Sequence, residues 1–142
     1  MARERTFFMI KPEVASDDEK VREIRKMITD AGFEIIAEKN TKIKKTIAEK
    51  HYAIHKGKPF YDGLIEYITS GRVVMFVLEK ENGIADLRKL VGATDPKKAE
   101  PGTIRARFGV DVGHNAVHAS DSPATAEFEI GLHFPKIKPK VE

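Results

Sequence analysis

The segment that most constrains the fold is Arg72–Leu78, because everything after its arginine is apolar. A run this short and this continuous predicts a central strand that is buried on both faces, and therefore a sheet that other elements cover. A second strand is predicted at Thr6–Ile10, which is also apolar and ends at Lys11-Pro12. This strand would carry Lys11 at its end.

Helical patterns alternate with these strands. From about Asp17 to Ala31, apolar residues recur at helical spacing, with capping residues before the segment and Gly32 after it. The other predicted elements are helices at Thr46–His55, Pro59–Ser70, Ile84–Val91 and Pro123 to about His133, and strands within Phe33–Ile43 and Asn115–His118. The resulting order, β-α-β-α-α-β-α-β-α, predicts an α+β fold of the ferredoxin-like sandwich type, with a four-stranded antiparallel sheet covered by helices.

Length and composition limit the class of protein. The chain has 142 residues without a break in composition, which predicts one domain. It contains no cysteine, which excludes disulfides and thiolate metal sites. There is no apolar run of membrane-spanning length, and the N-terminus lacks the apolar core of a signal peptide, so we expect a cytoplasmic protein. The net charge of +3 suits phosphorylated ligands without requiring them.

A long segment without strong periodicity, from about Gly92 to Gly113, is rich in glycine, proline and arginine. Loops of this length in small domains are usually functional. We expect Arg105 to lie in this loop, outside the packed core. Together with Lys11 and Arg88 it could bind phosphate, since guanidinium groups can contact two phosphate oxygens at once. Each of these cations, taken alone, is more often an ordinary surface charge.

One histidine stands at a position suited to catalysis. His118 ends a predicted strand just before the helix that Ser122 caps, and Glu129 follows that cap by seven residues, or about two turns. A carboxylate there could bond one ring nitrogen and leave the other as a nucleophile. The alternative is a histidine with no special role. Similarly, Phe60 at a helix start is either a stacking platform for a base or a packing residue.

From Arg5 to about Phe134, the sequence resembles the nucleoside diphosphate kinase family. The segment Asn115–Asp121 matches that family's pattern Asn-x-x-His-(Gly/Ala)-Ser-Asp. Further matching blocks follow in the expected order: Thr6–Pro12, His51-Tyr52, Lys58–Phe60, Ser70-Gly71, Gly92–Pro96 and Pro101–Arg105. The resemblance implies one such domain over residues 1–142. It also implies a kinase that moves the γ-phosphoryl group from a nucleoside triphosphate to a diphosphate in a ping-pong reaction.

The resemblance also implies individual roles. His118 would be phosphorylated on Nδ1, with Glu129 holding the other nitrogen and with Tyr52 and Ser120 assisting. Lys11 and Asn115 would bind the sugar 3′-hydroxyl, with Lys11 also near the γ-phosphate. The phosphates would be gripped by Arg88, Thr94 and Arg105, and the base would lie between Phe60 and Val112. The resemblance further implies a homo-oligomer, with a hexamer favoured over a tetramer, and Mg²⁺ carried by the nucleotide, because no cluster of carboxylates could cage it.

Some positions depart from the family pattern. Glu13-Val14 replaces the usual Asp-Gly, in a loop that is one residue longer, and Lys58 and His114 stand where arginine is common. Ala119 replaces the commoner glycine. Two other functions are compatible with this topology: RNA binding, and a regulatory role for a family member without activity. No strand has the aromatic pattern of RNA-binding sheets, and the proposed catalytic residues are all present, so specific nucleic-acid binding is not expected.

Overall fold

Strand β3 (Arg72–Glu81) lies inside a four-stranded sheet, as its apolar run predicts. The structure is a computed structural model that describes residues 3–137. The sheet has the order β2-β3-β1-β4, and every neighbouring pair is antiparallel. The other strands are β1 (Arg3–Ile10), β2 (Glu34–Lys42) and β4 (Val117–Ala119). The predicted fold class is confirmed. Residues 1–2 and 138–142 lie outside the described part, so the limits of the 1–142 domain stay a prediction.

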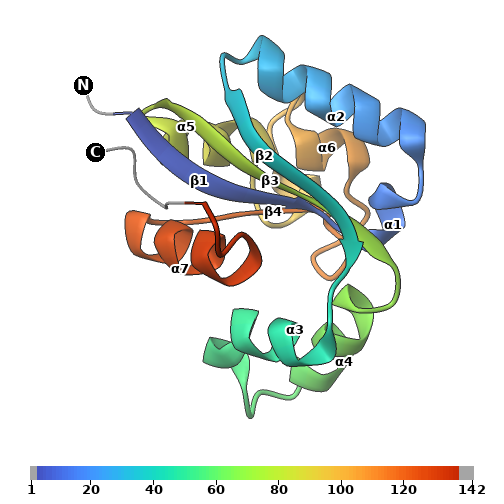
Figure 1. The fold of residues 1–142 in the computed structure, drawn as a ribbon. Helices are drawn as coiled ribbons and strands as arrows, with labels where there is room; N and C mark the ends of the chain where they lie inside the picture. Colours follow the sequence, from blue (N-terminus) through green and yellow to red (C-terminus); the bar gives the residue numbers. More distant parts are fainter. Residues whose placement is uncertain (1–2, 138–142) are drawn as a thin grey trace.

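The two central strands bury both of their faces, because side chains alternate along a strand. Phe8 and Phe76 belong to one apolar core, which also contains the buried face of α2 (Asp18–Asp30). Phe7 and Met75 belong to a second core on the opposite face, together with Ile130 of α7 (Pro123–His133). Figure 1 shows the sheet between these two groups of helices. The run of apolar residues in β3 is explained by this double burial.

Helices α5 and α6 complete the first core through Leu87 and Ile104, and α3 and α4 complete the second through Ala48 and Ile68. The remaining helical bounds are α1 (Pro12–Ala15), α3 (Lys45–His51), α4 (Tyr61–Ile68), α5 (Gly83–Val91), α6 (Ile104–Phe108), and the 3₁₀ helices η1 (Ala53–His55) and η2 (Pro96–Lys98). No helix of residues 3–137 is long and apolar enough to cross a membrane.

Three local predictions need correction. The stretch from Gly92 to Gly113 is not one irregular loop, since it contains η2 and α6, and the side chain of Thr103 caps α6 by accepting from the amide of Ala106. Helix α1 was missed because it has only four residues, too few for a periodic pattern. The helix expected over Thr46–His55 ends at His51 and continues as η1.

Candidate functional site

His118 lies in the middle of β4, at the edge of the sheet and opposite Met9 of β1. Its neighbours Val117 and Ala119 belong to the core on the α2 side. Alternation along the strand therefore turns His118 to the other face, where α7 lies. Its side chain is 22% exposed, so the ring is held by its surroundings and still reaches solvent.

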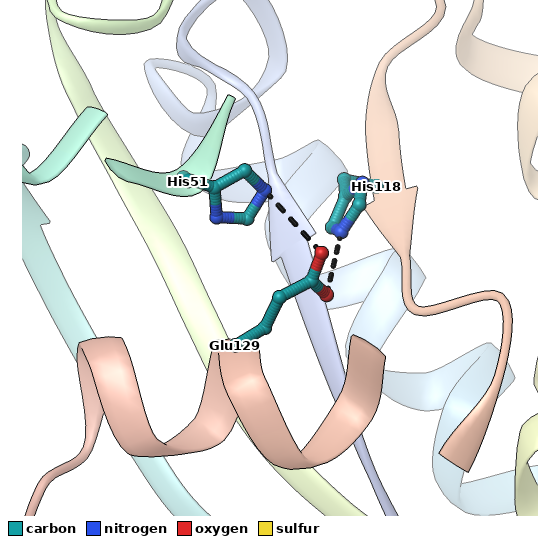
Figure 2. Close-up of side chains that lie close together, drawn as sticks. All are labelled: His51, His118 and Glu129. Atoms are coloured by element: carbon teal, nitrogen blue, oxygen red, sulfur yellow. Dashed lines mark hydrogen bonds and ion pairs between the residues drawn. The ribbon is translucent and has the colours of Figure 1, made fainter. Parts of the chain in front are cut away.

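Glu129 of α7 reaches back to this histidine (Figure 2). Nε2 of His118 is 2.9 Å from Oε1 of Glu129, and the same oxygen accepts a hydrogen bond of 2.5 Å from Oγ of Ser120. The N-cap predicted at Ser122 is confirmed, and the structure shows that it is part of a capping box: the Ser122 hydroxyl accepts from the amide of Thr125 at 3.1 Å. The helix start thus sets the distance between Glu129 and the strand that carries His118.

Lys11, at the end of β1, is joined to the segment before β4. Its Nζ donates a hydrogen bond of 2.9 Å to Oδ1 of Asn115, and Nδ2 of Asn115 donates to the carbonyl of Thr94 at 3.0 Å. Burial, followed by the nearby charge of Arg105, lowers the pKa of Lys11 to about 8, although Glu13 opposes the change. This lysine is therefore a cation that can lose its proton near neutral pH.

The sequence predicted that Arg105 lies in a loop outside the packed core, and this prediction is wrong. Arg105 belongs to α6 and is buried, and its guanidinium donates to the carbonyls of Gly92 at 3.1 Å and Val117 at 2.9 Å. Burial, with a contribution from Arg88, lowers its pKa to about 10. Arg88 projects from α5 and donates to the carbonyl of Ala119 at 3.3 Å. Both arginines are thus anchored to the backbone beside His118.

Two cavities adjoin along this side of the molecule. The first, of about 600 Å³, is lined by the two arginines and by His118, Thr94 and Glu129. The second, of about 740 Å³, is more apolar, and Lys11, Phe60 and Val112 contribute to its wall. Thr94 and His55 line both cavities. A cationic half and an aromatic half therefore meet at Thr94, an arrangement that suits a ligand with an anionic part and a flat apolar part.

The aromatic half is open to solvent. Phe60 and Val112 are 52% and 57% exposed, so these side chains are not core residues. Phe60 stands at the start of α4, with the ring of His55 at 5.2 Å. The side chain of Tyr52 is instead buried beside His51, and its hydroxyl has no hydrogen-bond partner within residues 3–137. Burial, together with the charge of Glu129, raises the pKa of Tyr52 above its usual range.

Two histidines behind the site were not assigned by sequence reasoning. Nδ1 of His51 is 2.9 Å from Nε2 of His133, and Nε2 of His51 is 3.6 Å from Oε2 of Glu129. Burial holds the pKa of His51 well below its usual value and lowers that of His133 to about 4. His133 follows Glu129 by four residues, and this spacing on one helix face is the signal that could have indicated it. His51 comes from α3, and no local pattern links the two.

Glu13 explains how the chain accommodates its unusual first loop. Its carboxylate accepts a hydrogen bond from the hydroxyl of Tyr67 in α4 and another, of 3.3 Å, from the amide of Ala116. Ala116 has a positive φ of 75°, an uncommon conformation for a residue with a side chain. The glutamate therefore ties α1 to α4 and to the strained turn that leads into β4.

The family model and the curated relatives that match this chain carry the same description. The family model described as "Nucleoside diphosphate kinase" matches residues 4–138. A curated relative of that name from Pelotomaculum thermopropionicum is 49% identical over 131 residues, which cover 92% of this chain and 87% of the relative.

Solved structures agree with this likeness. The nucleoside diphosphate kinase of Aquifex aeolicus superimposes with a TM-score of 0.90 at 38% identity, covering 99% of this chain and 100% of that one. The structure of a halophilic nucleoside diphosphate kinase from Halobacterium salinarum in complex with CDP gives a TM-score of 0.89 at 39% identity, covering 98% of this chain and 91% of that one.

Proposed function

This chain belongs to the nucleoside diphosphate kinase family, whose members transfer a γ-phosphoryl group through a phosphohistidine, and we propose that His118 is the residue phosphorylated here. The observation that carries the proposal is the hydrogen bond of 2.9 Å between Nε2 of His118 and Glu129. With the proton held on Nε2, the lone pair of Nδ1 is the one available to attack phosphorus. The carboxylate also stabilises the positive charge that the ring gains during transfer.

The two adjoining cavities support a pose for the nucleotide. The phosphates occupy the cationic half, where Arg88 and Arg105 compensate the charge that spreads over the equatorial oxygens in the transition state. Both guanidinium groups are already bonded to backbone carbonyls, so little ordering is needed on binding. Thr94, at the junction, contacts the phosphates from the loop after α5.

The sugar and the base occupy the second cavity. Lys11 and Asn115 are hydrogen-bonded to each other, and we assign both to the 3′-hydroxyl, with Lys11 also near the γ-phosphate. Lys11 lines this cavity, and the buried Asn115 holds its ammonium group in place. The base stacks on the exposed ring of Phe60, with Val112 on its other side. Because every base has a π-face, stacking discriminates little between bases. Ser120 assists through its hydrogen bond to Glu129, and we propose Tyr52 as a second helper because it lines the first cavity beside His118.

Mg²⁺ enters as part of the substrate, bound to the phosphates. This ion prefers an octahedron of oxygen ligands. Within residues 3–137, the candidate metal cluster consists of His51, His118 and Glu129, which offers two nitrogens and one carboxylate. That donor set suits Mg²⁺ poorly, so the chain's own role is to bind the phosphates that hold the ion.

We also propose a location and an assembly for the protein, both on the basis of the family resemblance. The protein is expected to act in the cytoplasm as a homo-oligomer, with a hexamer favoured over a tetramer. Sedimentation velocity of the purified protein distinguishes these two assemblies by mass.

The experiment that tests the catalytic proposal is incubation with γ-labelled ATP and Mg²⁺. The wild-type chain should acquire label that is lost in acid and retained in alkali, as expected of a phosphohistidine, and should pass it to added nucleoside diphosphate. His118→Ala should remain unlabelled while keeping its fold by circular dichroism. Stable label on that variant, or transfer by it, would refute the assignment.

A further inference from the structure

The cluster of His51, His118 and Glu129 contains a ring nitrogen that could bind a metal ion and that makes no hydrogen bond within residues 3–137. Nε2 of His51 is buried and has no hydrogen-bond partner among residues 3–137. It points at Oε2 of Glu129 from 3.6 Å, which is beyond hydrogen-bonding distance (Figure 2). Unpaired buried polar atoms are rare in proteins and call for a partner.

We propose that His51, His118 and Glu129 form a binding site for one Zn²⁺ ion, and that zinc bound there switches the kinase off. The ligand atoms of these three residues all lie within 4.8 Å of one another. Two histidines and one glutamate form a common zinc set that leaves a fourth position open. In a tetrahedron with bonds of about 2.1 Å, neighbouring ligand atoms are about 3.4 Å apart. The separations of 3.6 Å from Nε2 of His51 to Oε2 of Glu129 and of 2.9 Å from Nε2 of His118 to Oε1 lie on either side of that value.

The surroundings prepare His51 for this role. Metals bind the neutral imidazole, and Nε2 of His51 is a buried ring atom that makes no hydrogen bond within residues 3–137. Nδ1 of His51 lies 2.9 Å from Nε2 of His133, which can accept its proton. A ligating histidine typically donates its other ring proton to such an outer partner, which fixes the ring and the tautomer. His133 thus orients His51 with its Nε2 lone pair toward the carboxylate.

The set selects zinc over magnesium. Imidazole nitrogens suit Zn²⁺, whereas Mg²⁺ requires oxygen ligands. The charge of Glu129 offsets part of the repulsion from the nearby arginines. All three ligands line the cavity of about 600 Å³, so an ion from solvent can reach them past the partly exposed ring of His118.

Zinc at this position would stop phosphoryl transfer through the tautomer of His118. To bind the ion, Nε2 must first release the proton that it shares with Glu129, and the ring stays neutral by taking up one proton from solvent on Nδ1. That proton occupies the lone pair which would attack phosphorus, so the nucleophile is lost without any change in the ring's charge. This inhibitory step rests on the proposed role of His118, whereas the binding of zinc does not.

Titration calorimetry with Zn²⁺ alone tests the binding. We expect one ion per chain, unaffected by excess Mg²⁺. His133→Phe should weaken the affinity by about 10–100-fold, as loss of an outer partner does, and His51→Gln should weaken it more. The matched control is His114→Gln, which removes an exposed histidine paired with Asp111 and should leave the affinity unchanged. Absence of binding, or binding lost only in the control, overturns the proposal.

A second measurement tests the inhibition. Labelling by γ-labelled ATP and Mg²⁺ is followed while a chelator buffer fixes the free Zn²⁺. We expect the rate to fall at least tenfold at saturation, and to fall at higher free zinc in His133→Phe. A chain that binds zinc but labels at the full rate refutes the inhibitory step. A chain that never labels, even without zinc, refutes the proposed function and leaves the calorimetric result to decide the binding.

Discussion

Oε1 of Glu129 receives two hydrogen bonds, at 2.9 Å from Nε2 of His118 and at 2.5 Å from Oγ of Ser120. One oxygen of a buried carboxylate therefore fixes both the tautomer and the orientation of the ring. The serine lies two residues after the histidine, so the same short segment supplies both donors. The second oxygen of the carboxylate is left to face His51.

Glu129→Gln tests the importance of this carboxylate's charge. The amide can keep the hydrogen bond to the ring but cannot balance the positive charge that forms on it. In a comparable arrangement, loss of the orienting carboxylate lowers turnover by about 10⁴, and we expect a loss of about 10² or more here. Single-turnover labelling by ATP measures it. Ser120→Ala, which keeps the charge, should be affected less, and equal rates in both variants would contradict this role.

The fold was predictable because its strongest signals are local. The apolar run of β3 and the capping pattern at Ser122 each depend on a few adjacent residues, and both are confirmed. Helix α6 escaped prediction because it has five residues and its buried face is one side of a single turn. The burial of Arg105 was not predicted for the same reason. Only the tertiary structure brings the carbonyl of Val117 to the guanidinium of Arg105.

The candidate site was predictable in part. The pairing of His118 with Glu129 was predictable from helix geometry, because two turns of helix place Glu129 on the same face as the cap that follows His118. The approach of His51 to His118 does not follow from the sequence, since α3 and β4 are far apart along the chain. Packing of the second core brings them together. Roles taken from the family resemblance, such as that of Val112, stay predictions.

Lys11 gives the reaction an expected pH limit. Its pKa of about 8 means that the positive charge is largely present below pH 8 and is lost as the pH rises above it. If the charge assists phosphate binding, kcat/KM for ATP should decline above about pH 8. The pH profile measures this, since kcat/KM reports groups of the free enzyme. Lys11→Arg, whose charge persists, should lose the decline even if its rate is lower. An unchanged profile in that variant would assign the limit to another group.

His133 should make the fold sensitive to acid. Its folded pKa of about 4 lies below the unfolded value of about 6.5, so between these values the unfolded chain binds the proton and the folded chain does not. The free energy of unfolding therefore falls as the pH drops through this window, by about 3 kcal/mol near pH 4 from this group. Urea unfolding at several pH values measures it. His133→Phe, which can keep the stack on Phe7, should show a shallower fall.

Phe60 should make the enzyme tolerant of the base. The structure offers it as an exposed stacking surface, so we expect purine and pyrimidine nucleotides, with ribose or deoxyribose, to be accepted. Kinetics with eight nucleoside diphosphates test this. Phe60→Ala should raise KM for all of them, by about 1–3 kcal/mol of lost stacking. A preference above roughly 10³-fold for one base would instead indicate hydrogen-bond readout.

Arg105 is expected to contribute to both catalysis and stability, and the two effects can be separated. Arg105→Ala removes a cation that faces the developing phosphoryl charge, so kcat should fall by about 10²–10³ even at saturating nucleotide. It also leaves the carbonyls of Gly92 and Val117 without their donor, at a cost of about 2 kcal/mol, which should lower Tm by roughly 5 °C.

Arg88→Ala is the matched control for stability, because Arg88 makes a single, longer bond to Ala119 and its loss should leave Tm nearly unchanged. Single-turnover labelling and calorimetric scans measure the two effects. A raised KM with unchanged labelling rate would show that Arg105 only binds substrate, and an unchanged Tm would show that its backbone bonds do not hold α6 in place.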